Sequence, residues 1–314
     1  GKHARPIGLQ STGMSTRHQI LSLCLALVAC VPALHAQQDP LAEANRKYQS
    51  GDLAGARAIL DEVVRQPEHQ RSSEAWVLRG FILKDIYKGL PSGEEADAVR
   101  DEALASLFTS TVLDTARQYL QSSQQAYDFL CKTQYNDAAR ALNEMQDERA
   151  IRLYARYKEN LLRIDPGHAF LERDIEFNNA LATVYTKRYN QEREQTAYFD
   201  KAVDVYKKVL ALDSNNYGAN YNLATLYYNR GVYNIQRISV GTTIPDLNDI
   251  QRVAKEFFTL ALPYMKKAHE MNPKRRETLL GLEGIHYSLQ ETDKSEHYRF
   301  LYDQLDNEVP PKDK

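Results

Sequence analysis

The chain has 314 residues, 43% of them hydrophobic, which allows one or two domains with a sizeable core. Its 40 Lys and Arg against 42 Asp and Glu give a formal net charge of −2, which excludes a strong overall field for nucleic acid or anionic lipid. Abundant Ala, Leu, Tyr, Glu and Lys favour long helices over sheets, and 20 Tyr against one Trp indicate aromatic packing between helices.

The N-terminal stretch has the layout of a secretory signal peptide. A short basic region, MSTRHQ, begins at Met14 and precedes the apolar run ILSLCLALVACVPAL, which is too short to span a bilayer comfortably. We therefore expect residues 1–36 to be an N-terminal extension and signal peptide, and the protein to be exported. Two kinds of processing stay open: cleavage after Ala36, or lipidation of Cys30 in the lipobox-like LVAC. The apolar residues after Cys30 favour the soluble form, so we expect membrane association only if Cys30 is lipidated.

Cys131 is the one cysteine outside this segment, since Cys24 and Cys30 lie within it. An exported protein with one cysteine has no internal disulfide. The surrounding YDFLCK reads as a helix face, so we expect Cys131 to be a buried apolar residue rather than a nucleophile.

From about Asp39 the sequence reads as consecutive helix pairs. The first has Gly51 at its turn, and the next helix carries Trp76 and Gly80. The acidic stretch GLPSGEEADAVR predicts a longer turn or an extra helical turn before the partner helix. Residues 114–166 predict a diverged pair with a lengthened turn.

One helix-pair pattern then appears twice in succession, over residues 174–214 and 217–273, and a shorter copy covers 277–305. Small residues at fixed places let antiparallel helices approach closely, and a large residue of the partner helix fills the gap. The small residues follow Leu181 and Leu223 as Ala182 and Ala224, each with a Tyr three positions later, and recur as Ala202 and Ala261 in the second helices.

This pattern resembles the tetratricopeptide repeat (TPR), a helix-turn-helix unit of roughly 34 residues. The resemblance implies an all-α, TPR-like solenoid of antiparallel helix pairs, a right-handed superhelix over residues 39–306, before a polar tail at 307–314. With the exported N-terminus, the chain is similar to bacterial cell-envelope TPR proteins, which implies a periplasmic or envelope location. TPR arrays hold a peptide or helix in the groove lined by their first helices, which implies a non-enzymatic interaction scaffold.

Insertions separate the helices of the clear copies, a short polar one at residues 190–197 and a longer one at 232–257. The longer one either builds a ligand site or extends both helices to a raised turn. An apolar stripe of Val253, Phe257 and Leu260 favours extended helices.

The sequence assigns no catalytic, cofactor-binding or metal-binding residue. It has no phosphate-binding Gly-rich loop, no nucleophile elbow and no HExxH motif. His286 and His297 could meet across one helix pair, but two ligands without a third do not make a zinc site. The basic run around Lys274 to Arg276 flanks a helix C-terminus, where cations offset the dipole, and lacks aromatic residues for base stacking, so we expect no nucleic-acid binding.

The remaining candidate function is peptide recognition in the groove. Some TPR domains bind C-terminal carboxylates with Lys, Asn and Arg, but of the corresponding places here only Asn222 agrees. We expect a neutral surface for an uncharged peptide or helix, although its tyrosines could instead pack under the 232–257 insertion. Two alternatives are a lipid-anchored component of an outer-membrane assembly or export machine, and a ligand-binding protein using that insertion. The candidate peptide-binding residues are Asn179, Thr183, Tyr221, Asn222, Thr225, Tyr228, Leu280 and Tyr287.

Overall fold

The computed structural model describes residues 39–307, and within that range all regular elements are helices, α2 to α13. The all-α fold is confirmed. The chain divides into two compact units, Gly1–Leu130 and Cys131–Lys314, with the division inside α6 (Leu120–Asn143). The predicted signal peptide, the lipidation site Cys30 and residues 308–314 lie outside the described range. The single array over 39–306 and its right-handed superhelix stay predictions, and each unit is described by itself.

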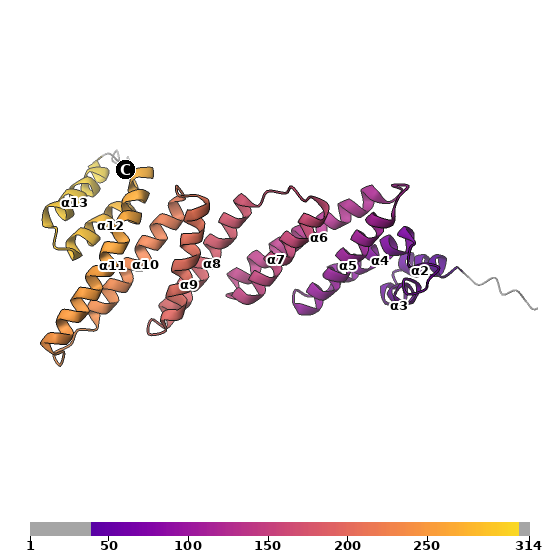
Figure 1. Ribbon diagram of the computed structural model, residues 1–314, viewed down its shortest axis with the longest axis horizontal. Coiled ribbons are helices and arrows are strands. Elements are labelled where there is room, and N and C mark those ends of the chain that lie inside the picture. Colours follow the sequence, from indigo (N-terminus) through magenta and orange to yellow (C-terminus); the bar gives the residue numbers. More distant parts are fainter. Residues whose placement is uncertain (1–38, 308–314) are drawn as a thin grey trace, which may run out of the picture. The chain divides into compact units, whose positions relative to one another are not determined.

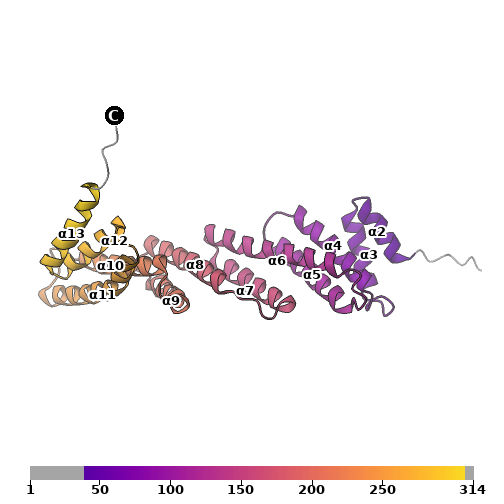
Figure 2. The same cartoon turned by 90° about the horizontal axis from the view of Figure 1, so that it is seen from above.

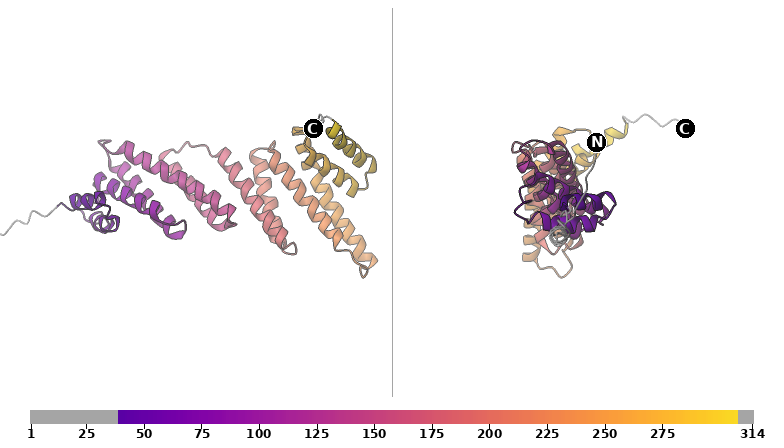
Figure 3. Two further views of the ribbon diagram at one scale, coloured as in Figure 1. Left: turned by 180° about the vertical axis from the view of Figure 1, so that it is seen from behind. Right: turned by 90° about the vertical axis from the view of Figure 1, so that its right-hand side faces the viewer.

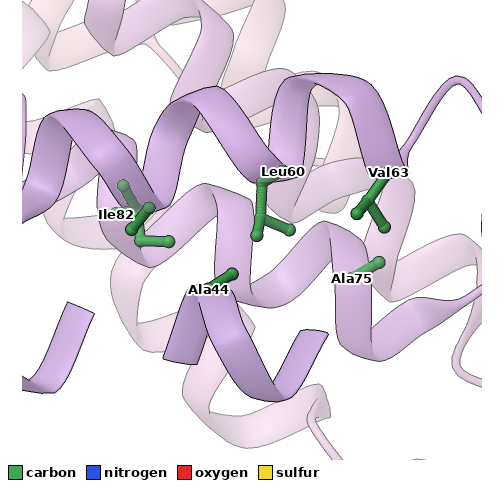
Figure 4. Packing of buried hydrophobic residues seen from close by; sticks show 6 residues of the cluster. Ala44, Leu60, Val63, Ala75 and Ile82 are labelled. Carbon is green, nitrogen blue, oxygen red and sulfur yellow. The ribbon is translucent and has the colours of Figure 1, made fainter. Parts of the chain in front are cut away.

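Unit 1 consists of two antiparallel helix pairs and the start of α6 (Figure 1, Figure 2). Its innermost cluster joins α2, α3 and α4, and Figure 4 shows small and branched side chains interleaved there. The pairs are α2 (Pro40–Gln49) with α3 (Leu53–Val63) and α4 (Ser73–Gly89) with α5 (Glu94–Leu113), and the cluster is Ala44, Ala56, Leu60, Val63, Ala75 and Ile82.

The acidic stretch between α4 and the body of α5 is mostly helical. α5 begins at Glu94, so the extra helical turn forms and only residues 90–93 connect it to α4. The two helices touch at Gly80, where an added Cβ would lie 2.6 Å from the Leu107 side chain. The small residue at this position therefore permits the close approach.

Unit 2 continues with further antiparallel pairs, and Leu181, Ala224 and Ala261 are buried as the repeat pattern requires. The packing of small against bulky residues is thus the TPR-like arrangement. Cys131 is fully buried, as predicted. The helices are α7 (Asp147–Ile164), α8 (Leu171–Gln191), α9 (Thr196–Leu212), α10 (Tyr217–Gln236), α11 (Ile244–Met271), α12 (Arg276–Ser288) and α13 (Thr292–Asn307).

The predicted lengthened turn in residues 114–166 is wrong. α6 is 24 residues long, and only Glu144 to Gln146 connect it to α7. The extra length lies in the helix, because Met145 takes a left-handed conformation (φ 61°) that closes the turn at once.

The same turn closes three pairs. Gly51 (φ 86°), Met145 (φ 61°) and Gln290 (φ 61°) each follow the first helix of a pair. After each, the next backbone N–H donates to a carbonyl five residues earlier, at 2.9, 2.8 and 2.9 Å respectively. This is the Schellman geometry of helix C-termini, which glycine adopts most easily.

The long insertion forms extended helices. α10 runs to Gln236 and α11 starts at Ile244, where Thr243 caps it by accepting a hydrogen bond from the Asp246 N–H. Figure 3 shows this hairpin reaching beyond the α12–α13 pair. The predicted stripe is wrong at Leu260, which is 46% exposed. Val253 and Phe257 are half-buried, and the fully buried face consists of Ala254, Phe258, Ala261, Met265 and Ala268.

Two glycines set the closest approaches in unit 2. A Cβ on Gly231 would lie 2.5 Å from the Phe258 ring, and one on Gly281 would lie 2.4 Å from Met265.

No helix within residues 39–307 has both the length and the apolar character that crossing a membrane requires.

Candidate functional site

The predicted groove residues lie on the first helices of three consecutive pairs in unit 2, and we call them the first-helix face. α10 contacts both α8 and α12. No member of the face is fully buried, and Leu280 and Tyr287 are exposed. The face consists of Asn179 and Thr183 on α8, Tyr221, Asn222, Thr225 and Tyr228 on α10, and Leu280 and Tyr287 on α12.

At one end of the face, Asn179 joins α8 to the N-terminus of α10. Its Nδ2 donates to Asn216 Oδ1 at 3.2 Å, and Asn216 caps α10 by accepting from the Ala219 N–H at 2.9 Å. Asn179 Oδ1 is buried and accepts no hydrogen bond within the described residues. This end of the face therefore has an unmet acceptor.

Tyr221 is held by a stacked neighbour. The rings of Tyr217 and Tyr221 are 6.0 Å apart and nearly parallel, at 4°. The Tyr217 hydroxyl donates to Glu277 Oε1 at 3.1 Å, while the Arg275 guanidinium lies 4.6 Å from the Tyr217 ring. Burial, and then the bond to Glu277, raise the pKa of Tyr217 to about 12, so the hydroxyl keeps its proton. Tyr221 is half-buried and held on one side by this contact.

A cavity of about 170 Å³, lined mostly by residues with polar side chains, lies between α8 and α10, and we call it the polar hollow. The buried Tyr206 of α9 closes its floor, within hydrogen-bonding reach of Thr183, Thr186 and Asn222, and burial raises the pKa of its hydroxyl. The hollow is lined by Thr183, Thr186, Lys187 and Asn190 of α8, Tyr206, and Asn222, Thr225, Leu226 and Asn229 of α10. Its surface is neutral apart from Lys187.

The structure thus brings Thr183, Asn222 and Thr225 together in one cavity, while sequence reasoning missed the other lining residues. On α8 they recur at spacings of three and four from Thr183, and on α10 at the same spacings from Asn222. Continuing the predicted groove residues by one further turn along α8 and along α10 would have found them. Tyr206 has no such signature because it comes from the second helix of a pair.

Tyr228 packs rather than lines a groove. Its ring centroid is 5.6 Å from that of Phe258, and its hydroxyl oxygen would lie 2.9 Å from a Cβ on Gly284. Tyr228 therefore joins α10 to α11 and α12. Tyr287 is the opposite case, because it is 76% exposed.

Two open cavities, of about 470 and 440 Å³, lie where the long α10–α11 hairpin passes the shorter α12, and we call them the step cavities. Ile235, Phe258, Ser288 and Gln290 line both. Among the residues lining them, Arg252 and Lys255 are the charged ones, and Arg252 is paired with Asp249 at 2.6 Å. The larger of the two is the more apolar.

His286 and His297, the two histidines considered for a zinc site, both lie beside the ring of Tyr298. His286 is buried, its Nδ1 is 2.5 Å from Glu291 Oε2, and its ring stacks on Tyr298. The ring of His297 contacts the same tyrosine from α13. The described part of the chain contains no group of three or more His, Cys, Asp or Glu placed to hold a metal ion.

The basic run at residues 274–276 is engaged in internal contacts. Arg275 pairs with Glu277 at 2.8 Å, and Arg276 pairs with Asp306 and lies over Tyr302. These partners neutralise the two arginines, so the run offers little net charge to a polyanion.

Comparisons with known proteins find no family model and no curated protein that matches the sequence. Solved structures resemble the chain distantly. One is a crystal structure of MamA, at 12% identity and a TM-score of 0.27, covering 84% of this chain and 94% of that one. Another is a human IFIT1 dimer with m7Gppp-AAAA, at 16% identity and a TM-score of 0.29, covering 91% of this chain and 64% of that one. A monomeric IFIT1 mutant with Gppp-AAAA has 17% identity and the same TM-score of 0.29, covering 85% and 59%. These likenesses are too distant to transfer a function.

Proposed function

We propose that the protein is a non-enzymatic interaction scaffold that binds a peptide or helix of a partner protein along the first-helix face of unit 2. The observation that carries this proposal is the polar hollow, which opens between two first helices and holds three of the predicted residues. Tyr221, which precedes Asn222 of the hollow on α10, stacks on Tyr217. Rigid aromatic residues next to hydrogen-bonding groups are typical of protein-binding surfaces.

The eight residues of the first-helix face are all uncharged. The face offers hydroxyls, amides and tyrosine rings, and Arg275, which lies over Tyr217, is already paired with Glu277. A neutral groove suits an extended peptide or an amphipathic helix with few charges.

A blocking substitution tests the site. Thr225→Arg places a long cation in the half-buried wall of the polar hollow and should lower crosslinked capture of the native partner at least about tenfold, a loss of roughly 1.4 kcal/mol or more in binding. Thr259→Arg is the matched control, because Thr259 is exposed on α11 and makes the same bond to its own helix. Equal capture by both variants, with unchanged thermal unfolding, would remove the groove proposal.

We further propose that the scaffold works in the bacterial periplasm or envelope, as the N-terminal pattern indicates. Mass measurement of the mature protein from membrane and soluble fractions tests this. A chain beginning after Ala36 supports a soluble protein, an acylated N-terminal Cys30 supports a lipid-anchored component of an envelope assembly or export machine, and an unprocessed chain contradicts export.

A second candidate is binding at the step cavities, which favour it by their volumes of about 470 and 440 Å³. Here Ile235→Asp should abolish capture while Thr225→Arg has no effect. The reverse pattern supports the first-helix face.

A further inference from the structure

The last described helix, α13, carries an aromatic residue in the middle of its outer face (Figure 1). Tyr298 stacks inward on the ring of His286 of α12. Phe300 points the other way, because residues two apart on a helix lie about 200° from each other, and it is 58% exposed. The packing of the helices therefore does not account for this side chain.

Three acidic residues share the outer face with Phe300. Asp293, Glu296 and Asp303 lie at helical spacings from it that place them on the same side of α13. All three are exposed, and none has an ion pair in the part of the chain that the structure describes. We call Phe300 with these acids the α13 knob. Two knobs would repel each other, so a contact between two α13 outer faces is disfavoured.

The same end of unit 2 carries a cavity of complementary character. The larger step cavity, of about 470 Å³, has no charged residue in its lining, and Ile235 and Tyr287 on its walls are 37% and 76% exposed. Its volume is that of roughly fifteen waters, which leaves room for a phenylalanine side chain. Lys255 lines the adjoining step cavity, is exposed and has no ion pair among residues 39–307.

We propose that two copies of this chain associate by docking the Phe300 of each into the larger step cavity of the other. An aromatic side chain that enters an uncharged, partly apolar pocket is a typical binding anchor. Lys255 beside that pocket then faces the acids of the incoming knob, so the charges at the rim are complementary. One chain thus carries both an apolar projection with a negative rim and an apolar cavity with a positive one.

The two surfaces lie close enough on one protomer for reciprocal docking. Thr292, the first residue of α13, lines the larger step cavity, and Phe300 follows about 12 Å along the helix. A two-fold axis between them lets each copy give its knob and receive the other's, which closes the dimer. This contact goes beyond the proposed function: it uses no residue of the polar hollow, and it closes the step cavities to any other partner.

Sedimentation velocity of the full chain tests the inference. The wild type should shift from monomer to dimer between about 1 and 300 µM, as expected for a small interface. Phe300→Asp and Ile235→Asp should each raise the dimer dissociation constant at least about tenfold, because each places a charge in both apolar contacts. Phe129→Asp is the matched control, since Phe129 is 41% exposed on α6, outside the helices of the proposed contact, and should leave the constant unchanged.

A mixture of the two variants identifies the docking partners. The Phe300→Asp protein keeps its cavity intact, and the Ile235→Asp protein keeps its phenylalanine, so one of the two contacts forms again between unlike copies. The mixed dimer should therefore be at least about threefold tighter than either variant dimer. A variant that had lost its fold could not give this gain.

A wild type that stays monomeric up to about 300 µM, a Phe129→Asp defect equal to that of Phe300→Asp, or no gain on mixing would each overturn the inference. The proposed function is judged separately, by crosslinked capture of the partner protein. Thr225→Arg should lose capture and keep the wild-type dimer dissociation constant, and Phe300→Asp should do the opposite.

Discussion

At the scale of single residues, glycine decides how closely the helices of unit 2 approach. Gly231 on α10 faces Phe258 on α11, which is 4% exposed and has little room to move. A methyl group there would overlap the rigid ring, so the helices would have to separate.

Gly231→Ala should therefore lower the free energy of unfolding by about 1–3 kcal/mol, the usual cost of overpacking. Gly218→Ala on the same helix is the control, since its Cβ would meet nothing closer than 3.6 Å and should leave stability unchanged or raised by up to about 1 kcal/mol. Urea unfolding followed by circular dichroism measures both. A Gly231→Ala protein as stable as Gly218→Ala would mean that the two helices are less tightly packed than described.

His269 makes stability sensitive to mild acid. It is half-buried on α11 with its ring 5.7 Å from Tyr298, and its Nδ1 is buried without a hydrogen-bond partner in the described range. Burial lowers the pKa of His269 below its ordinary value of 6.5, the positive charge of His297 acts in the same direction, and Glu270 opposes both.

Because the folded state binds this proton less readily than the unfolded state, the stabilising contribution is full above about pH 6.5 and lost as pH falls through the folded pKa. The thermal midpoint of the wild type should drop more between about pH 7.5 and pH 5 than that of His269→Phe. Equal drops would show that His269 is not the group responsible.

At the scale of helices and turns, three pairs share one left-handed turn, but only the first has glycine in it. Gly51 marked its turn in the sequence. Met145 is not a residue type that indicates a turn, and the turn after α6 was therefore predicted to be too long. Helix positions and the small-to-bulky packing were predictable because they repeat with helical spacing, whereas a left-handed Met is fixed by tertiary contacts that no local pattern reveals.

Gln290→Gly should raise the free energy of unfolding by about 1 kcal/mol, because glycine has no Cβ to oppose the left-handed conformation. The same substitution in the middle of α11, Gln251→Gly, should cost about 1 kcal/mol, since glycine is a poor helix former. Chemical unfolding of both variants checks the opposite signs. Two losses of similar size would contradict the turn geometry.

At the scale of the whole molecule, charge is nearly balanced, with a formal net charge of −2. The sequence predicted this near-zero net charge. It also predicted three of the residues that line the polar hollow. It did not indicate Tyr206, which reaches the cavity from a second helix, or the packing role of Tyr228, because both depend on how neighbouring pairs dock.

Recognition by a neutral groove should resist salt. Crosslinked capture of the partner should change less than about twofold between roughly 0.05 and 0.5 M NaCl, because screening weakens charge pairs and leaves buried hydrogen bonds almost unaffected. A loss of tenfold or more at the higher concentration would indicate a charged interface outside the polar hollow.

The raised turn between α10 and α11 has a practical use. Just after α10, the Ile238 N–H donates to the Ile235 carbonyl, and Ser239 begins a separate set of bonds through Thr242 and the Thr243 cap. A short fluorescent or epitope tag inserted between Ile238 and Ser239 therefore interrupts neither helix end, and the labelled protein can be followed in living cells.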